Sequence, residues 1–227
     1  MHRPSRHYRV VVATLTRSRP QMLGMLIRSW AQIQLPQNCS VSFLVVENDT
    51  EPRSATVVQN ANEMMAETPL RHVLEPQLGI AYARNRAARE AICQAADLLL
   101  FIDDDEEPAE DWLVRIVSAY RYSGALLLGG PVRARPPLQV LTPLEAKIYA
   151  NVADYYWQRE KQMHAAVVRN GRPVRIATNN WLADLSLFTK YGLWFDDTLG
   201  FSGGEDSDFS TKVHDMGLPM LWVDDAI

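Results

Sequence analysis

The chain has 227 residues, of which 47% are hydrophobic and 22% are charged, a balance typical of globular proteins that bury a large core. Its 23 basic and 27 acidic residues give a net charge of -4, which argues against DNA or RNA as the main ligand. The two cysteines, Cys39 and Cys93, are far apart in sequence and indicate neither a disulfide framework nor a thiolate zinc site.

No stretch of the sequence reaches the roughly 18 to 20 apolar residues that a membrane span needs. The first ten residues, MHRPSRHYRV, are basic, but the apolar run after them is too short for a secretion signal. We therefore expect a cytoplasmic protein. The basic N-terminus leaves open a peripheral contact with the inner face of a membrane, although a frayed, solvated terminus is the simpler interpretation.

Strand and helix patterns alternate over the first 120 residues. Apolar or β-branched runs predict strands at 9–15, 41–48, 72–75 and 97–105. Helix-forming stretches lie between and after them, at 20–33, 53–66, 79–96 and 108–120. This alternation predicts βαβ units and a mostly parallel sheet, in which ligands bind at the carboxyl ends of the strands. The polar strand exits at 14–19, 47–50 and 103–107 should therefore converge on one crevice.

The second half has a different pattern. A strand is expected at 125–136, interrupted at Gly129 and Gly130, and a helix with an aromatic face at 143–164. A long strand-like run at 174–188 precedes a glycine-rich loop that opens a helix at 203–217. The last residues, MLWVDDAI, have the pattern of a strand but lack the polar residues that usually follow the end of a strand. We therefore expect that the natural chain continues.

Five consecutive carboxylates, DDDEE at 103–107, follow the apolar run LLLFI. They repel one another unless water, basic side chains or a cation offsets their charge. If the strand continues, alternation places Asp103 and Asp105 on one face, where they could bind one Mg²⁺ or Mn²⁺ ion. For Glu106 and Glu107 we favour the alternative, a solvated helix N-terminus where acidic side chains interact favourably with the helix dipole.

The segment GIAYARNRA (79–87) places arginines and Asn85 near the start of a helix, where anions bind. Arg84 and Arg86 point about 200° apart in a helix, so at most one of them faces the crevice. A helix with only solvent-facing arginines is the alternative.

The segment FSGGEDSDF (201–209) places Glu205 and Asp206 after two glycines that allow close backbone approach to a ligand. A carboxylate there could act as a general base toward an attacking hydroxyl. Helix capping by Ser202, Glu205 or Asp206 is an equally good local explanation.

Six motifs occur in the order and spacing of the family 2 glycosyltransferases of the GT-A fold, which the chain resembles from about residue 8 to 227. They are VVVATLTRSRP, FLVVENDT, LGIAYARNRA, FIDDDEEP, NNWLADLSLFTKYGLWFDDTLGFSGGEDSDF and GLPMLWVDDA. The resemblance implies one α/β GT-A domain over 1–227, with a Rossmann-like, mixed but mostly parallel sheet flanked by helices. It further implies that 1–120 bind the nucleotide-sugar and 121–227 the acceptor.

The resemblance also implies roles for individual residues. Asp103 and Asp105 would hold a Mn²⁺ or Mg²⁺ ion, and the same motif, with Asp104, would hold the donor diphosphate. Asp206, beside Glu205, matches the catalytic base. The implied donor contacts are Thr14, Thr16 and Arg17 in the first loop, Glu47 or Asp49 after the second strand, and Arg84 or Asn85 against the base or phosphates.

The implied reaction is an inverting transfer from a nucleotide-sugar, with a UDP-sugar favoured, to a carbohydrate or glycolipid acceptor, as in bacterial polysaccharide assembly. Two features depart from the family pattern. The first loop has ATLTRSRP in place of the commoner Pro-x-Tyr-Asn, and a later histidine that can join the metal site is missing. His214 lies too early to take that role and is expected on the surface of a helix.

Aromatic residues of the second half could form a sugar-stacking platform for the acceptor, although core packing explains most of them equally well. They are Tyr149, Tyr155, Tyr156, Trp157, Trp181 and Trp194. We single out Trp181 together with Asn180, because their segment faces the acceptor in the family.

Two other functions compete with the transferase interpretation. A phosphatase of the haloacid dehalogenase type also places acids after a strand, but its DxDxT pattern is not met by DDDEE. A nucleotide-sugar or cation binding module without turnover is the second alternative, and the GGEDSD segment argues against it, because a binding module needs no base.

Overall fold

The computed structural model describes residues 6–65, 68–135, 139–168, 175–200 and 203–227, without the side chains of 164–168. Its strands are β1 (Tyr8–Thr16), β2 (Cys39–Glu47), β3 (Leu70–Leu74), β4 (Leu98–Ile102), β5 (Leu127–Gly129), β6 (Asn180–Asp184) and β7 (Met220–Trp222). Its helices are α1 (Pro20–Trp30), α2 (Ala55–Ala61), α3 (Ile80–Cys93), α4 (Trp112–Ser123), α5 (Pro143–Val168), α6 (Ser186–Thr189), the 3-10 turn η1 (Asp197–Leu199) and α7 (Glu205–Asp215).

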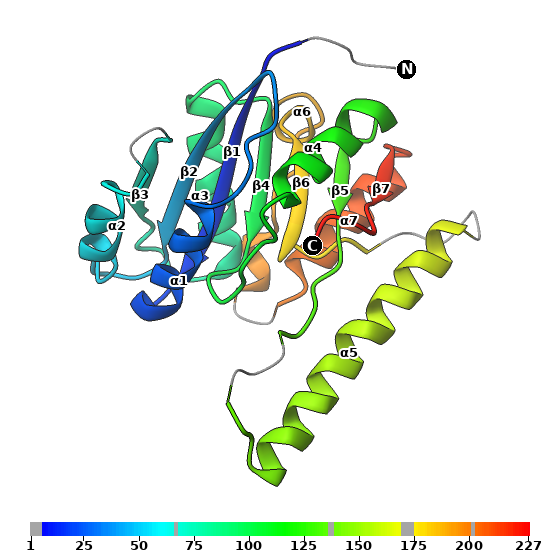
Figure 1. The fold of residues 1–227 in the computed structure, drawn as a ribbon. Coiled ribbons are helices and arrows are strands. Elements are labelled where there is room, and N and C mark those ends of the chain that lie inside the picture. The colour runs from blue at the N-terminus through cyan, green and yellow to red at the C-terminus, as the bar shows by residue number, and fades with distance from the viewer. Residues whose placement is uncertain (1–5, 66–67, 136–138, 169–174, 201–202) are drawn as a thin grey trace.

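Within the described residues, seven strands form one sheet in the order β3-β2-β1-β4-β6-β5-β7 (Figure 1). β1 pairs in parallel with β2 and β4, β2 pairs in parallel with β3, and β5 pairs in parallel with β7. β6 lies between β4 and β5 and is antiparallel to both. The predicted mixed, mostly parallel sheet is therefore confirmed.

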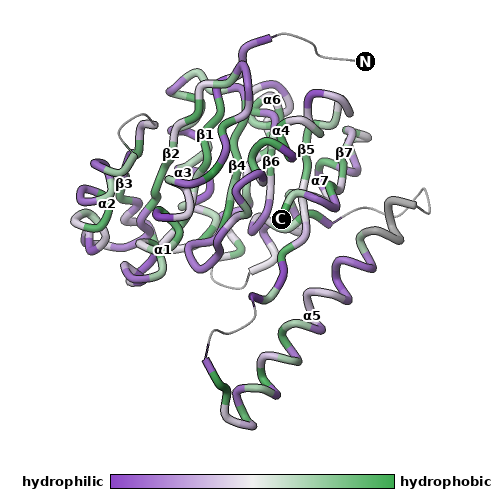
Figure 2. Tube along the Cα trace, viewed as in Figure 1, coloured by the Kyte–Doolittle hydropathy of each residue, from purple (hydrophilic) through white to green (hydrophobic). Residues whose placement is uncertain are grey.

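Alternate side chains of the strands enter two separate hydrophobic layers, as period-two geometry requires. Val10 and Val12 of β1 pack with α1, α2 and α4 on one face, whereas Val11 and Ala13 pack with α3, α6 and α7 on the other. A strand covered on both faces has no polar side, which explains the continuous apolar runs of the sequence. Figure 2 shows these hydrophobic residues along the central strands.

β4 ends at Ile102, so the prediction that the strand continues through Asp103 and Asp105 is wrong. Its ladder with β1 stops at the pair formed by Phe101 and Ala13. Successive carboxylates are poorly suited to a buried ladder, because each would lose its hydration without gaining a counter-charge. The chain leaves the sheet in a turn at 104–105, which directs Asp104 toward β1 and away from Asp103 and Asp105.

Two elements of the second half differ from their predicted lengths. The run at 174–188 contains only a short strand, β6, which is followed by the single helical turn α6. α5 instead extends past the predicted end, to Val168, and Figure 1 shows it set apart from the layers of the sheet. Its start is a capping box, in which Thr142 Oγ1 accepts from the N–H of Glu145 (3.3 Å) and Glu145 accepts from the N–H of Thr142 (2.8 Å).

Across the described parts of the chain, no helix combines the length and the apolar character that crossing a membrane requires. Of the basic N-terminal residues, His2 and Arg3 lie outside the described range. Arg6 forms an ion pair with Asp97, and His7 Nε2 lies 2.7 Å from the hydroxyl of Ser40. The predicted contact of this segment with a membrane stays a prediction.

Candidate active site

Segments that are distant in the sequence meet at the carboxyl edge of the parallel strands. β1, β2 and β4 run in the same direction and therefore end on the same edge. The carbonyl of Thr16 accepts from the N–H of Asn48 (2.9 Å), and the side-chain oxygen of Asn48 accepts from the N–H of Gly79 (2.8 Å) at the start of α3. The predicted convergence of the polar strand exits is thus confirmed.

The three aspartates after β4 occupy two kinds of position. Asp104 is buried and points back toward β1, where its carboxylate accepts from Thr16 Oγ1 (2.7 Å) and Arg19 Nη1 (3.1 Å). Its side chain is therefore used within the protein, which corrects the expectation that it faces the donor. Asp103 and Asp105 line one common pocket. Their shared direction comes from the turn and not from strand alternation.

Negative charge is concentrated around Asp103. Burial, together with the charges of Asp105, Asp104 and Asp206, raises the pKa of Asp103 to about 6, against the opposing effect of Arg84. Burial and the charge of Asp103 likewise raise the pKa of Glu106 to about 9. Arg84 and Asp206 both act on the pKa of Asp103, and the ion pair between Arg84 and Glu205 joins the start of α3 to the start of α7.

The acidic cluster suits a divalent cation that a ligand helps to hold. Among the residues described, no three His, Cys, Asp or Glu side chains are grouped as a complete metal site. A Mg²⁺ ion is commonly bound by one or two carboxylates, with water and phosphate oxygens in the remaining positions. Asp103 and Asp105 fit this arrangement, because the raised pKa of Asp103 indicates negative charge without full compensation. His214, exposed near the end of α7 beside Asp215 (3.1 Å), is not part of this cluster.

Arg19 is a site residue that the sequence interpretation did not single out. Its Nη1 lies 3.1 Å from Asp104 and 3.4 Å from Asp105, so it is the cation that the protein itself places against the aspartates. The side chain remains 53% exposed and is therefore accessible to a ligand. The sequence signal that could have identified Arg19 is its position in the loop TRSRP, between the first strand and the first helix.

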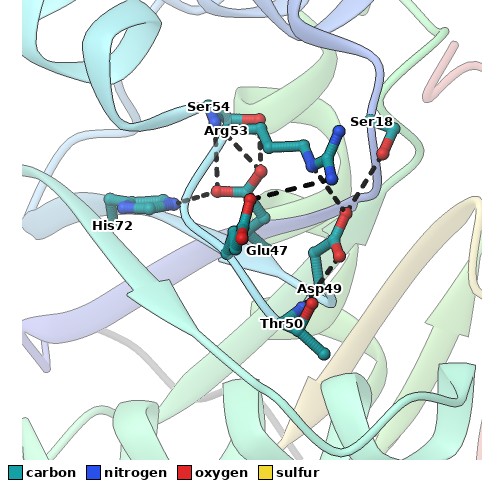
Figure 3. A network of polar contacts seen from close by, with 8 residues as sticks. Ser18, Glu47, Asp49, Thr50, Arg53, Ser54 and His72 are labelled. Atoms are coloured by element: carbon teal, nitrogen blue, oxygen red, sulfur yellow. Dashed lines mark hydrogen bonds and ion pairs between the residues drawn. The ribbon is translucent and has the colours of Figure 1, made fainter.

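Glu47 is fully buried and organises the loop after β2 (Figure 3). Its carboxylate accepts from the N–H and the hydroxyl of Ser54 (2.9 Å each) and lies 2.9 Å from His72 Nε2 on β3. These contacts occupy both carboxylate oxygens. The prediction that Glu47 itself binds the nucleoside is therefore replaced by a structural role, in which it holds the loop between β2 and α2.

Asp49, the other acid of this loop, is also buried, at 7% exposure, and its side chain keeps only a small exposed part. It accepts from Thr50 N–H (2.8 Å) and Ser18 Oγ (3.1 Å), and Arg53 lies 3.6 Å away (Figure 3). The Thr50 N–H, with the other polar partners, lowers the pKa of Asp49. Arg17, nearby on the surface, adds a positive charge.

The two threonines of β1 do not present free hydroxyls to a ligand. Thr14 is completely buried, so its predicted contact with the nucleoside is wrong. Thr16 is also buried and donates its hydroxyl hydrogen to Asp104. Both follow from the central position of β1, which is covered on its two faces.

At the start of α3, Arg84 and Asn85 are both buried and both have protein partners. Arg84 forms an ion pair with Glu205 and lies over the ring of Phe195 (5.6 Å). Asn85 donates to the carbonyl of Phe195 (2.9 Å) and accepts from its N–H (3.1 Å), so this buried amide is held by the protein, against the predicted contact with the nucleotide. Arg86 instead pairs with Glu90 (3.0 Å), which agrees with the prediction that at most one of the two arginines faces the crevice.

At the start of α7, the two acids also differ. Glu205 is buried against Arg84, so it neither caps the helix nor reaches a substrate, and the predicted catalytic role of Glu205 becomes a structural one. Asp206 is partly exposed and accepts only from the N–H of Ser207 (2.6 Å) among the contacts described. The N-cap is Gly204, with φ of 90°, which has no side chain to cap the helix. Ser202 lies outside the described residues.

Trp181 does not face an acceptor, so this part of the prediction is wrong, whereas Asn180 lines the pocket beside Asp103 and Asp105. Trp181 is 1% exposed and packs against Phe101 (5.2 Å) and Phe209 (5.7 Å). Asn180 accepts from Trp112 Nε1 (2.9 Å) and donates to the carbonyls of Pro131 (3.0 Å) and Ala226 (2.7 Å). β6 is an interior strand, so side chains on both its faces enter the core.

The family model described as Glycosyl transferase family 2 matches residues 10–182, which run from within β1 to within β6. The chain belongs to glycosyl transferase family 2. This membership, predicted from the six motifs, excludes the phosphatase alternative. A relative, the succinoglycan biosynthesis protein ExoM of Rhizobium meliloti (strain 1021), is 30% identical to this family 2 chain over 99% of the chain and 69% of the relative.

Solved structures share the fold of this family 2 chain. The mannosyltransferase PcManGT from Pyrobaculum calidifontis, in complex with GDP-Man and Mn²⁺, superposes with a TM-score of 0.71 at 20% identity over 100% of the chain. TarS 1-349 of S. aureus, in complex with UDP-GlcNAc, superposes with a TM-score of 0.70 at 14% identity over 96%. The chain spans 57% and 56% of these two proteins, respectively. The predicted GT-A fold is thereby confirmed.

Proposed function

We propose that this chain transfers a sugar from a nucleotide-sugar to the hydroxyl of a carbohydrate acceptor during polysaccharide assembly. The observation that carries the proposal is the gathering of Asp103, Asp105 and Asp206 at one edge of the sheet. The similarity to a succinoglycan biosynthesis protein supports a polysaccharide product. Residues 1–120 would bind the donor and 121–227 the acceptor.

The donor's nucleoside would bind between the loops that follow β1 and β2. Arg17 is exposed and suited to this role, Asp49 would contribute the small exposed part of its carboxylate, and Glu47 holds the second loop in place. Arg19 would contact the diphosphate, because an exposed guanidinium matches phosphate geometry. A UDP-sugar is our preferred donor, and the UDP-GlcNAc complex of TarS supports this choice.

A Mn²⁺ or Mg²⁺ ion held by Asp103 and Asp105 would stabilise the negative charge that develops on the departing nucleoside diphosphate. The PcManGT complex with GDP-Man and Mn²⁺ supports this assignment. Asp104 contributes indirectly, since its hydrogen bond to Thr16 holds the turn that carries its two neighbours.

Asp206 would accept the proton of the acceptor hydroxyl as that oxygen attacks the anomeric carbon. The new bond forms between the acceptor oxygen and the anomeric carbon, and the bond from that carbon to the phosphate oxygen breaks. Its electron pair leaves with the nucleoside diphosphate. One displacement from the face opposite the leaving group inverts the anomeric configuration.

The proposal is tested by incubating the protein with Mn²⁺ and UDP-, GDP- and dTDP-sugars and measuring the release of nucleoside diphosphate. We expect release from one donor class, and we expect Asp105→Ala to weaken Mn²⁺-dependent nucleotide binding by about 10- to 100-fold. Asp111→Ala, which removes an exposed acid from the same chain region, serves as the control. Nucleotide-sugar binding without release, even with acceptors present, would instead identify a binding module.

A further inference from the structure

A pocket of about 400 Å³ opens beside Asp103 and Asp105. Its other walls come from the residues around the aspartates, up to Trp112 of α4, and from the second half of the chain: the segment 131–135 after β5, Tyr156 of α5, Asn179 and Asn180 at the start of β6, and Ile227. None of the lining residues belongs to β1, β2 or α3, which surround the expected nucleotide site. The pocket therefore borders the aspartates on the side away from the donor's nucleoside.

One face of α5 turns toward this pocket. Tyr149, Ala153, Tyr156, Glu160 and Met163 recur every three or four residues and are the partly or fully buried positions of that face. The opposite face is exposed, with Leu144, Ile148, Val152 and Tyr155. Tyr156 therefore lies in the middle of the inward face.

Two contacts on either side of Tyr156 tie α5 to the segment 131–135. Glu160 forms a bidentate ion pair with Arg133, at 2.6 and 3.1 Å, and the hydroxyl of Tyr149 lies 3.5 Å from the carbonyl of Ala134. These contacts hold the ring of Tyr156 at the pocket. Burial, and the negative charges of Glu106, Asp105 and Asp103, raise the pKa of its phenol, which shows that it lies near the acidic cluster.

The pocket combines an aromatic ring with several hydrogen-bonding groups. The amide of Asn179 donates to Glu106 (3.2 Å), and Arg135 pairs with Glu107 at the rim. A sugar ring has an apolar C–H face and a periphery of hydroxyls, so it requires this pairing of a flat apolar surface with donors and acceptors. The pocket's volume is within the range of small-ligand sites.

We propose that this pocket is the acceptor subsite and that a sugar ring of the acceptor packs on Tyr156. The proposal rests on the proposed function, and it replaces the acceptor contact predicted for Trp181, which is buried, while Asn180 lies in the pocket wall. Asp206, the acid proposed above to receive the acceptor's proton, follows Glu205, whose ion pair with Arg84 fixes the start of α7.

Saturation-transfer NMR with cellobiose, lactose, maltose and N,N′-diacetylchitobiose, each titrated separately, tests the subsite directly. The wild type should bind at least one of the four, and Tyr156→Ala should weaken that binding by about tenfold, the order of an aromatic contact. Tyr156→Phe should retain it, because the ring remains. Tyr155→Ala is the matched control: its ring is the neighbour of Tyr156 (5.4 Å) but is 59% exposed and does not line the pocket.

Affinity for UDP and GDP with Mn²⁺, measured on the same samples by calorimetry, separates this proposal from the proposed function. Weaker disaccharide binding by Tyr156→Ala with unchanged nucleotide affinity supports the acceptor subsite. If the wild type binds a disaccharide through Tyr156 but binds no nucleotide, the proposed function is rejected and the pocket is a saccharide site alone. Equal disaccharide binding by Tyr156→Ala and wild type, or none by the wild type, would overturn the subsite.

Discussion

The hydroxyl of Thr16 donates a hydrogen bond of 2.7 Å to Asp104, joining the end of β1 to the turn after β4. The carboxylate of Asp104, the middle aspartate of the DDD motif, is therefore bound within the protein. The outer two, Asp103 and Asp105, are left to line the pocket. Arg19 completes the arrangement by placing a positive charge against Asp104 and Asp105.

Removing the charge of Arg19 should strengthen the binding of Mn²⁺ to the nucleotide-free protein. Arg19 lies 3.4 Å from Asp105 and competes with a cation for that carboxylate. An exposed ion pair of this kind contributes up to about 1 kcal/mol, so Arg19→Gln should raise the Mn²⁺ affinity by about two- to fivefold. Electron paramagnetic resonance of free Mn²⁺ measures the change. Arg28→Gln, an exposed arginine of α1, controls for net charge, and an equal effect of both variants would contradict the competition.

Replacing Asp206 by asparagine should remove the general base and leave donor binding intact. Transfer should fall by on the order of a hundredfold or more, the usual contribution of a positioned base. Nucleoside diphosphate release in the presence of acceptor measures the rate, and calorimetry measures donor affinity. Asp208→Asn is the matched control, because Asp208 lies in the same first turn of α7 and pairs with Lys212 (2.6 Å). Full activity of Asp206→Asn would show that the base lies elsewhere.

The ion pair between Arg84 and Glu205 should be important for stability. Both side chains are nearly inaccessible, so Arg84→Ala leaves a carboxylate buried without its partner. We expect this change to lower the free energy of unfolding by about 3 to 5 kcal/mol. Arg86→Ala, which breaks a partly exposed pair two residues further along, should cost about 1 kcal/mol or less. Urea denaturation compares the two, and similar losses would mean that the buried pair is not specially stabilising.

Without a divalent cation, the ionisation of Asp103 should reduce stability. Its pKa in the folded protein is about 6, against an ordinary value of 3.8, because of burial first and neighbouring carboxylates second. The unfolded chain therefore loses this proton at lower pH than the folded chain does, and stability falls as pH rises from 3.8 to about 6. Asp103→Asn should remove the contribution of Asp103 to this loss of stability, so the variant should be more stable than the wild type at neutral pH. Urea denaturation in the presence of a chelator, repeated across this pH window, measures the difference. Parallel pH profiles for the two proteins would contradict the assignment.

Sequence alone was sufficient for the features that depend on local pattern. The β-branched run that includes Val10 to Ala13 identified the central strand, because a strand covered on both faces must be apolar on both. The six ordered motifs identified the family. The convergence of the strand exits also followed, since parallel strands joined by helices must end at one edge of the sheet.

Only the tertiary structure decided what each polar residue of those motifs does. Asp104, Glu47 and Asn85 carry the same functional groups as ligand-binding residues, yet their hydrogen bonds go to Thr16, to Ser54 and His72, and to Phe195. Trp181 looked suited to stacking on a sugar, but its strand lies inside the sheet, whereas Tyr156 reaches the pocket from a helix set apart from it. Most of these partners are distant in the sequence, and the direction of a side chain after a turn follows from packing. A local pattern can therefore name the chemistry of a site, while the three-dimensional contacts determine which of its residues remain available to a substrate.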